Sequence, residues 1–433
     1  MKKKFYIAIV SLLCVAVVGV IGFGIYKYKN SEKPKEPEKP NVIKPGEYGD
    51  TDFSVRLIKT TNSTQTSNYL ISPYSIEIAL NMLKDGAKEN SYKQINDLIG
   101  TRKIPVFNAK NRISVTNGAF IKDIYKDSVK KEFYSKLNNY KAEIVYDKFT
   151  TPDKINNWVK EKTYGMIPEI LKEMSPDFVL GLANAVAIDV KWDTQFECIN
   201  TTKEEFTYEN GSNANVEMMH NTFEYGDTKY FETNEGKGIV IPYDKYDSEG
   251  RNEYEDGNTV AKDYTQLEFV GILPNKGVTD YIEKITKEDL KSLGDNATTT
   301  KEADINVALP RFSYSFDLTN FREILMVMGV TDVFDPMVAD LSNIIGNPGD
   351  IYVSTAIHKT YIDLNEKGTK AAAVTYFGMD KNAAIPQQRK QVSIKFNKPF
   401  VYMIRDSKTK EILFFGVVRE PNVWKGSTCS NEQ

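Results

Sequence analysis

The sequence predicts a fold of the α+β class, in which helices and strands are mixed without regular alternation. The run from Phe178 to Trp192 is too apolar for a solvent-facing strand, so we expect it near the centre of a sheet covered on both faces. The C-terminal half is rich in further strand-like segments, and no internal repeat is visible. The irregular order of the elements argues against a doubly wound parallel sheet.

The clearest helix begins at Ser72-Pro73, because serine is a favoured N-cap residue and proline is favoured in the first turn. Its buried face is supplied by apolar residues between Ile76 and Leu83, and Gly86 lies at its end. Other helices are expected over residues 52–60, 128–137, 152–162 and 321–328.

Strands are expected where apolar residues alternate or run together between turn residues. In chain order they are residues 113–121, 142–146 and 178–192, a strand around Met218, and residues 239–243, 267–273, 305–309, 351–364, 393–396, 400–405 and 412–418. The segment 251–262 is polar and contains Gly257, so we expect a loop there.

Composition excludes several functional classes. The 433 residues are 41% apolar and 27% charged, as in an ordinary globular protein. The net charge of −3 makes nucleic acid a poor candidate partner. Only two histidines are present, His220 and His358, and there is no Gly-x-Ser-x-Gly elbow. We therefore expect no catalytic residue, no metal and no cofactor, with His220 as a partly exposed residue at a strand end.

The three cysteines, Cys14, Cys198 and Cys429, are widely spaced and form no metal or redox motif. The sequence leaves open whether Cys198 and Cys429 are paired.

The first 29 residues are interpreted as a membrane anchor or a signal segment. Three lysines precede an uncharged, mainly apolar run of 21 residues from Phe5 to Ile25, about the length that spans a bilayer as a helix. No clean small-x-small cleavage site precedes Lys27. An uncleaved anchor is therefore preferred over a cleaved signal peptide, and a lipoprotein attached through Cys14 is the third alternative. Both main alternatives place the folded part outside the cytoplasm.

Residues 30–47 form a spacer with four prolines interleaved with Lys and Glu. A single globular domain is expected over residues 48–421, followed by a polar tail over residues 422–433. Roughly 385 residues are many for one hydrophobic core, so a single domain of this size needs an explanation.

Small residues alternate in a segment near the C-terminus. Thr369, Ala371, Ala373 and Thr375 fall on one face of an extended chain, because strand side chains point to opposite faces in turn. The segment is polar enough to be exposed and small enough on one face to become a buried central strand.

Several segments taken together resemble the serpin family of serine protease inhibitors, over roughly residues 51–421. In chain order they are Asn68 to Ile76, Gly86-Ala87, Asn117 to Phe120, Ile155 to Val159, Ala183 to Ala185 with Lys191-Trp192, Leu309 to Phe312, Met328 to Val330, His358 to Thr360, Phe396 to Phe400, and Phe415-Gly416 with Pro421. Each is weak alone, but their order and spacing are specific. The resemblance implies a bacterial member, anchored or secreted, with three β-sheets, about eight or nine helices and an exposed reactive-centre loop in one domain.

The resemblance also implies roles for three groups of residues. The shutter, a polar cluster beneath the central sheet, is matched by Ser72, Ser75, Asn184 and His358. The breach, where the loop first enters that sheet, is matched by Trp192 and Glu366. The hinge of the loop is matched by Glu366, Gly368, Thr369, Ala371, Ala372 and Ala373.

The expected activity is inhibition of serine proteases, with cysteine proteases as a further class, by suicide-substrate trapping. The protease forms a covalent acyl-enzyme with the loop, and the cleaved hinge then inserts into the sheet as a new strand. No proline interrupts Thr369 to Lys381, which suits a central strand. The competing hypothesis is a non-inhibitory serpin-fold binding or scaffold protein at the cell surface.

Family spacing counted from Glu366 places the reactive bond between Asn382 and Ala383. The alternative bond, Lys381–Asn382, would imply a trypsin-like target. The expected partners are the target protease, in a covalent complex, and the membrane through the N-terminal segment, and the protein itself is expected to be a monomer.

Overall fold

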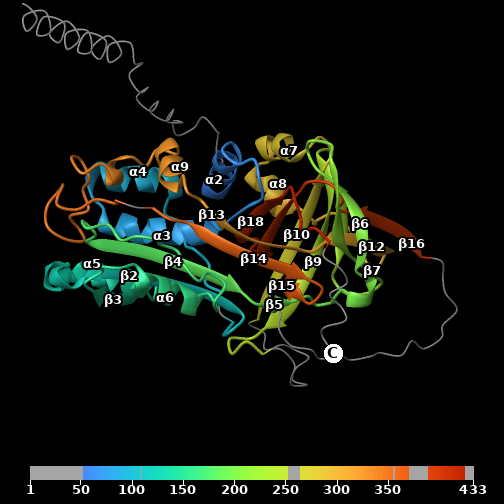
Figure 1. Cartoon of the computed structure of the whole chain (residues 1–433), viewed down its shortest axis with the longest axis horizontal. Coiled ribbons are helices and arrows are strands. Elements are labelled where there is room, and N and C mark those ends of the chain that lie inside the picture. Colours follow the sequence, from blue (N-terminus) through green and yellow to red (C-terminus); the bar gives the residue numbers. More distant parts are fainter. Residues whose placement is uncertain (1–51, 108, 252–263, 355, 370–388, 425–433) are drawn as a thin grey trace, which may run out of the picture. The chain divides into compact units, whose positions relative to one another are not determined.

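The computed structural model describes residues 52–107, 109–251, 264–354, 356–369 and 389–424 (Figure 1). The predicted anchor, the spacer and the loop beyond Thr369 lie outside these residues. Among the described helices, none is long and apolar enough to cross a membrane. Cys198 is disulfide-bonded, and because the other two cysteines are Cys14 and Cys429, its partner lies outside the described residues.

The part of the chain that the structure describes contains eight α-helices. They are α2 (Phe53–Asn62), α3 (Pro73–Gly86), α4 (Glu89–Ile99), α5 (Lys131–Asn139), α6 (Asp153–Lys162), α7 (Val278–Lys284), α8 (Lys287–Ser292) and α9 (Phe321–Val327). The predicted start of α3 is confirmed, since the Ser72 side chain accepts a hydrogen bond from the N–H of Ser75. Helix α4 was not predicted, and it begins after Lys88 without a side-chain cap that the sequence could have signalled.

The largest sheet has seven strands in the order β1-β18-β17-β10-β9-β8-β11, and all neighbouring strands are antiparallel. The strands are β1 (Tyr69–Ile71), β8 (Lys229–Glu232), β9 (Gly236–Tyr246), β10 (Thr265–Pro274), β11 (Thr298–Thr299), β17 (Phe400–Asp406) and β18 (Ile412–Val418). Every residue of β17 and β18 is buried, so both faces of the sheet are covered here.

A second sheet has four strands in the order β16-β12-β7-β6. They are β6 (Thr202–Thr207), β7 (Asn213–Phe223), β12 (Ala303–Pro310) and β16 (Lys390–Lys395). β16 is an edge strand that pairs in parallel with β12, and it begins one residue after the loop segment that lies outside the described residues.

Two further sheets lie on either side of the first turn of α3. One has the order β13-β14-β15-β5 and the other β3-β2-β4. Their strands are β13 (Phe312–Asp317), β14 (Lys359–Asn365), β15 (Gly368–Thr369), β5 (Val190–Lys191), β3 (Glu143–Asp147), β2 (Ile113–Lys122) and β4 (Leu180–Ile188). The Ser75 hydroxyl donates to Asn184 O in β4, while the Ser72 N–H donates to His358 just before β14. Figure 1 shows β4 and β14 running alongside each other over α3.

One strand is shorter than the sequence predicted. Residues 351–364 were expected to be extended throughout, but the strand begins only at Lys359. Within the described residues, the segment ahead of it pairs with no neighbouring strand. A strand is stabilised by hydrogen bonds to a neighbouring strand. Because the segment before Lys359 pairs with no described strand, it does not form one itself.

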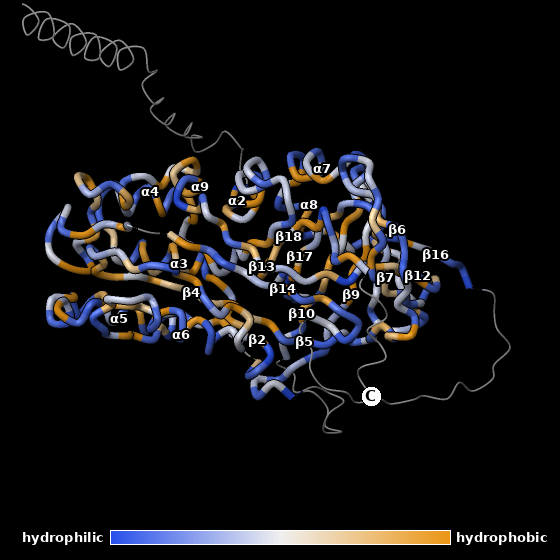
Figure 2. The backbone as a smooth tube through the Cα atoms, viewed as in Figure 1, coloured by the Kyte–Doolittle hydropathy of each residue, from blue (hydrophilic) through white to orange (hydrophobic). Residues whose placement is uncertain are grey.

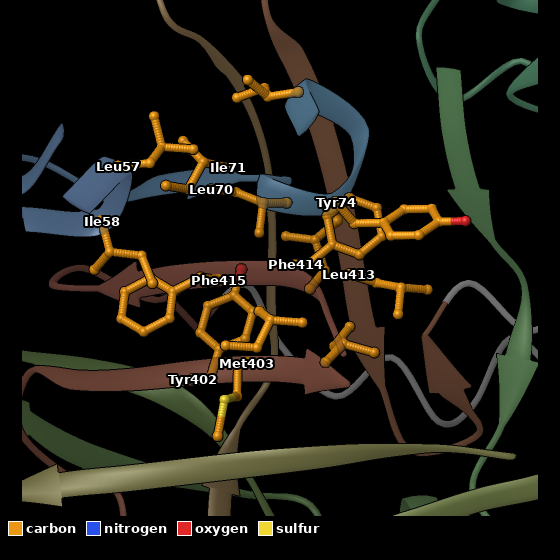
Figure 3. Close-up of a cluster of buried hydrophobic side chains, with 14 of the residues drawn as sticks. Leu57, Ile58, Leu70, Ile71, Tyr74, Tyr402, Met403, Leu413, Phe414 and Phe415 are labelled. Atoms are coloured by element: carbon orange, nitrogen blue, oxygen red, sulfur yellow. The ribbon is translucent and has the colours of Figure 1, made fainter. Parts of the chain in front are cut away.

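The hydrophobic core joins the helices to the largest sheet. Figure 3 shows Leu57 and Ile58 of α2 packed near Leu70 and Ile71 of β1, above Tyr402 and Phe415 of the β17–β18 pair. Figure 2 shows the same arrangement coloured by hydropathy, with apolar segments along the strands. The core fixes the N-terminus of α3, and through it the polar groups that lie beneath β4 and β14.

Candidate functional site

The hinge begins as a short strand held between two others. Gly368 and Thr369 form β15, which pairs with Asn365 and Leu364 of β14 on one side. On the other side the same two residues pair with Lys191 and Val190 of β5. The chain therefore turns back from β14 and lies between β14 and β5.

Gly368 is required at this point by its surroundings. Its φ is +149°, and a Cβ atom added there would lie 2.2 Å from the carbonyl oxygen of Val190. Only a residue without a side chain allows the hinge and β5 to approach this closely.

Glu366 anchors the turn that precedes the hinge. Its carboxylate lies 2.8 Å from Arg311 Nη2 and accepts a hydrogen bond of 2.5 Å from the Thr201 hydroxyl. Its backbone oxygen accepts a hydrogen bond from the N–H of Phe196. Arg311 also lies 3.4 Å from Glu217. Glu366 is 4% exposed, and charged partners are what make such burial tolerable.

Trp192 packs beside the same turn. Its backbone N–H donates to Lys367 O, and its indole N–H donates to Asn365 O at 2.9 Å. Its ring stacks on Tyr243 with centroids 4.5 Å apart and planes 7° apart. The Tyr243 hydroxyl in turn lies 2.8 Å from Thr369 Oγ1. Burial raises the pKa of Tyr243, so its hydroxyl remains protonated.

The four polar residues predicted beneath the sheet are brought together. The N–H of Ser72 donates to His358 Nε2 at 3.0 Å, and the Ser72 hydroxyl donates to Leu413 O at 2.6 Å. The Ser75 hydroxyl reaches the backbone oxygen of Asn184 at 3.5 Å. The cluster thus joins the N-terminus of α3 to both sheets.

Asn117 of β2, for which the sequence predicted no role, is also part of this cluster. The Asn184 amide donates to Asn117 Oδ1 at 2.6 Å, and the Asn117 amide donates to Tyr140 O. The side-chain oxygen of Asn184 is buried and has no hydrogen-bond partner among the described residues. Buried acceptors normally accept a hydrogen bond. A donor group placed beside this oxygen would therefore form a favourable hydrogen bond with it.

His358 is neutral in this setting. Complete burial lowers the pKa of its imidazole from 6.5 to about 3. The unprotonated Nε2 can then accept the hydrogen bond from Ser72, which an imidazolium could not do.

An apolar cavity of about 250 Å³ opens below the polar cluster. Leu180 and Leu182 of β4 line one side, and Ser354 and Ala356 line the other. β4 is the last strand of its sheet, and its edge towards the cavity pairs with no described strand. The hinge therefore leads towards a gap with two unpaired strand edges and an apolar floor.

Most of the chain also matches a known protein family. A family model described as Serpin (serine protease inhibitor) matches residues 48–421. The chain belongs to the serpin family. The predicted serpin-like α+β fold is confirmed, and the family is one of protease inhibitors that are generally not catalytic enzymes.

Relatives and solved structures agree with the family assignment. An uncharacterized serpin-like protein of Thermococcus kodakarensis is 30% identical over 82% of this chain and 81% of its own. Alpha-1-antiproteinase F of Cavia porcellus is 30% identical over 83% of this chain and 87% of its own. The thermophilic serpin Tengpin in its native state matches with a TM-score of 0.70 and 30% identity, over 90% of this chain and 95% of its own. The structure of Tengpin in its latent state matches with a TM-score of 0.66 and 28% identity, over 88% of this chain and 99% of its own.

Other predicted site residues fall outside this cluster or outside the described residues. Lys381, Asn382 and Ala383 of the reactive bond, and Ala371, Ala372 and Ala373 of the hinge, lie outside the described residues. His220 is half-exposed in β7, where its Nε2 lies 2.6 Å from Glu204 Oε1. Within the described ranges, no group of three His, Cys, Asp or Glu residues is placed to hold a metal ion.

Proposed function

We propose that this serpin inhibits serine proteases as a suicide substrate, by inserting the cleaved loop between β4 and β14. The observation that carries the proposal is β15, which pairs with β14 on one side and with β5, the strand that follows β4 in the chain, on the other. Below it the two facing edges have no partner among the described residues. A strand that continued from Thr369 would supply hydrogen bonds to both.

The register of β15 predicts where each loop residue would lie. Because both pairings are antiparallel, every step forward from Thr369 is one step back from Leu364 and one step back from Val190. The neighbours across the gap would be Ile362 and Ile188 for Ala371, Thr360 and Val186 for Ala373, His358 and Asn184 for Thr375, Ala356 and Leu182 for Phe377, and Ser354 and Leu180 for Met379.

This register matches the chemistry of the gap in two places. Thr375 would lie beside Asn184, whose side-chain oxygen lacks a donor among the described residues. Phe377 and Met379 would lie between the residues that line the apolar cavity. Thr375 would thus contact the polar cluster, and Phe377 and Met379 would lie in the apolar cavity.

The same register accounts for Gly378, a residue that favours strands poorly. It would face the outer side of the sheet, opposite Gly181. Phe178 already lies 3.1 Å from the position of a Cβ at Gly181. A glycine in the inserted strand leaves room for that ring.

Insertion also supplies the energy for trapping. From Gly368 to Asn382 an inserted strand would span about 45 Å at ~3.3 Å per residue, and an attached protease would be carried that far. A dozen new hydrogen bonds at ~0.5–1.5 kcal/mol each give on the order of 10 kcal/mol. The uncleaved state is then metastable and is kept by a kinetic barrier.

The target and the location belong to the same proposal. Cleavage at Asn382–Ala383 fits elastase-like or subtilisin-like proteases, and cleavage at Lys381–Asn382 fits trypsin-like ones. The folded domain would act outside the cell as a monomer, held at the membrane by the apolar run from Phe5 to Ile25. Retention in a membrane fraction after a high-salt wash tests the anchor, and recovery of soluble protein lacking residues 1–25 contradicts it.

The test of inhibition is a covalent complex with a protease from a trypsin-like, elastase-like and subtilisin-like panel. We expect an SDS-resistant band of the combined mass, with the released C-terminal peptide identifying the cut bond. Thr369→Arg places a charge on the inward face and should give cleavage without a complex. Lys370→Arg, one residue along on the outward face, is the matched control and should still trap. Trapping by Thr369→Arg would contradict the insertion mechanism. Cleavage without a complex by the natural protein across the panel would favour the non-inhibitory scaffold.

A further inference from the structure

Several side chains around the apolar cavity beside α3 are incompletely packed. Ala79 and Leu83 of α3, Leu182 of β4 and Val353 in the segment before β14 all line the cavity. Each of the four is only half-buried, so part of its apolar surface faces this space. Covering such surface with an apolar group removes it from water, which is favourable.

The cavity, of about 250 Å³, suits an apolar ligand better than water. A buried water molecule needs several polar partners, and most of the lining side chains are aliphatic or aromatic. A dry apolar cavity of ~150 Å³ is large enough to bind benzene. In proportion, the cavity beside α3 can hold a ligand of about ten non-hydrogen atoms.

The polar end of the cavity offers a hydrogen-bond acceptor and a hydrogen-bond donor. The side-chain oxygen of Asn184 is buried and has no partner among the described residues. The Ser75 hydroxyl, which also lines the cavity, reaches its backbone acceptor only at 3.5 Å, where a hydrogen bond is weak. A ligand hydroxyl can donate to Asn184 and accept from Ser75, so an alcohol head group fits this end.

The charges around the cavity disfavour an anionic head group. The described residues that line it include no lysine or arginine, and their one carboxylate, that of Glu173, is exposed. The imidazole of His358 is neutral, because burial lowers its pKa. A ligand carboxylate beside the Asn184 oxygen would lose its water without gaining a cation, which is costly. The lining therefore selects a neutral ligand over a fatty acid.

We propose that the cavity between α3, β4 and the segment before β14 binds a medium-chain aliphatic alcohol in the uncleaved protein. The chain would lie against the apolar walls, with its hydroxyl at Asn184 and Ser75. The inference rests on the proposed function in one respect, since the same gap would receive the cleaved loop. A bound alcohol would compete with the loop, so a protease would cut the loop and leave without being trapped.

The test measures binding of 1-octanol to the uncleaved full-length protein by titration calorimetry, and we expect a single saturable site. Methyl heptyl ether, an isomer of octanol without a hydroxyl, should bind about fivefold more weakly because it cannot donate a hydrogen bond. Octanoate should bind at least ~10-fold more weakly than octanol. The absence of saturable octanol binding, or octanoate binding as tight as that of octanol, would overturn the proposal.

Ala79→Phe tests the location of the site. The added ring would project from α3 into the cavity, and octanol affinity should fall at least ~10-fold because the ring takes the space of the alkyl chain. Ala214→Phe is the matched control, since Ala214 is half-buried on β7 and does not line the cavity; it should bind octanol as the natural protein does. Equal octanol affinity of Ala79→Phe and the natural protein would overturn the proposal. The ligand series on the natural protein decides the question if Ala79→Phe folds poorly.

The cleaved protein separates this site from the proposed function. If the cleaved loop inserts, it fills the cavity, and the cleaved protein should bind no octanol. Equal octanol binding by the uncleaved and cleaved forms would uphold the ligand site and contradict insertion. No binding by the uncleaved form, together with a rise in melting temperature on cleavage, would overturn the ligand site and support insertion.

Discussion

The hydroxyl of Tyr243 lies 2.8 Å from Oγ1 of Thr369, and both groups are buried. Tyr243 belongs to β9 of the largest sheet, while Thr369 is the last described residue before the loop. This hydrogen bond ties the first inward residue of the hinge to the core, and the stacked Trp192 ring fixes the orientation of the tyrosine. In the proposed mechanism, the first residue of the inserted strand is therefore already in place before cleavage.

Gly368→Ala should impair trapping. Its Cβ would meet the Val190 oxygen at 2.2 Å, which forces β15 away from β5 and moves Thr369 from Tyr243. We expect several loop cleavages for each protease trapped, measured by titrating a fixed amount of protease. Gly211→Ala is the control, because Gly211 also has a positive φ of +81° but no atom within 4 Å of its Cβ position. Equal effects of the two substitutions would mean that backbone strain, not close approach, is responsible.

Glu366→Gln should loosen the breach. It removes the charge that Arg311 approaches at 2.8 Å in a buried site, and the loss of one such partner costs about 1–3 kcal/mol. The expected outcome is a lower urea midpoint of unfolding in the uncleaved protein. Glu235→Gln is the matched control, since it removes a half-exposed pair with Lys284 at 2.9 Å, where the cost is ~0–1 kcal/mol. A smaller loss at Glu366 than at Glu235 contradicts the anchoring role.

Acid should destabilise the uncleaved protein through His358. The folded-state pKa of about 3 lies below the value of 6.5 for an unburied imidazole, so the unfolded chain binds the additional proton between these values. Stability from this group is complete above pH 6.5 and falls as the pH drops towards 3, by on the order of 5 kcal/mol. Free energies of unfolding measured in urea from pH 7.5 to pH 4 should therefore decline.

His358→Gln isolates this contribution from that of the carboxyl groups. Glutamine can accept the Ser72 hydrogen bond but does not titrate. The variant should be less stable at pH 7.5 and should lose less stability on acidification. Parallel curves for the two proteins would show that His358 does not cause the pH dependence.

Thr375→Val tests the register of insertion. It keeps the shape of the side chain and removes the hydroxyl that is predicted to donate to Asn184. The cleaved protein should lose about 1 kcal/mol of stability, while the uncleaved protein should be unchanged within error. Thr60→Val, which lies on α2 away from the gap, is a control that should affect both forms alike. An equal loss in both forms at Thr375 would place its hydroxyl elsewhere.

Local signals made part of this account predictable from the sequence. Ser72 and Pro73 mark the start of α3 through capping chemistry that needs no tertiary information. The alternation of small residues in the hinge likewise predicts, without tertiary information, which side chains would point inward in an extended strand. Family resemblance identified Asn184 and His358, which the structure joins through the N-terminus of α3.

Contacts between distant segments were not predictable in this way. Arg311 and Thr201 contact Glu366 but lie at strand ends far from it in the sequence. Neither residue belongs to a sequence pattern that predicts this contact. The contacts of Arg389 could not be predicted either, because its partner Thr300 is separated from it by 89 positions. Residues 351–358 were expected to form a strand because they are apolar, but hydropathy does not report the absence of a partner strand.

The central claim is that the gap between β4 and β14 accepts the cleaved loop. The most direct measurement is the melting temperature before and after a single cut between Thr369 and Arg389 by a protease that is not trapped. A gain on the order of 10 kcal/mol corresponds to a rise of about 10–15 °C for a domain that spans residues 48–421, at ~2.1 cal/mol/K of unfolding entropy per residue, and this is the result we predict. An unchanged melting temperature after complete cleavage would contradict insertion, and with it the inhibitory mechanism.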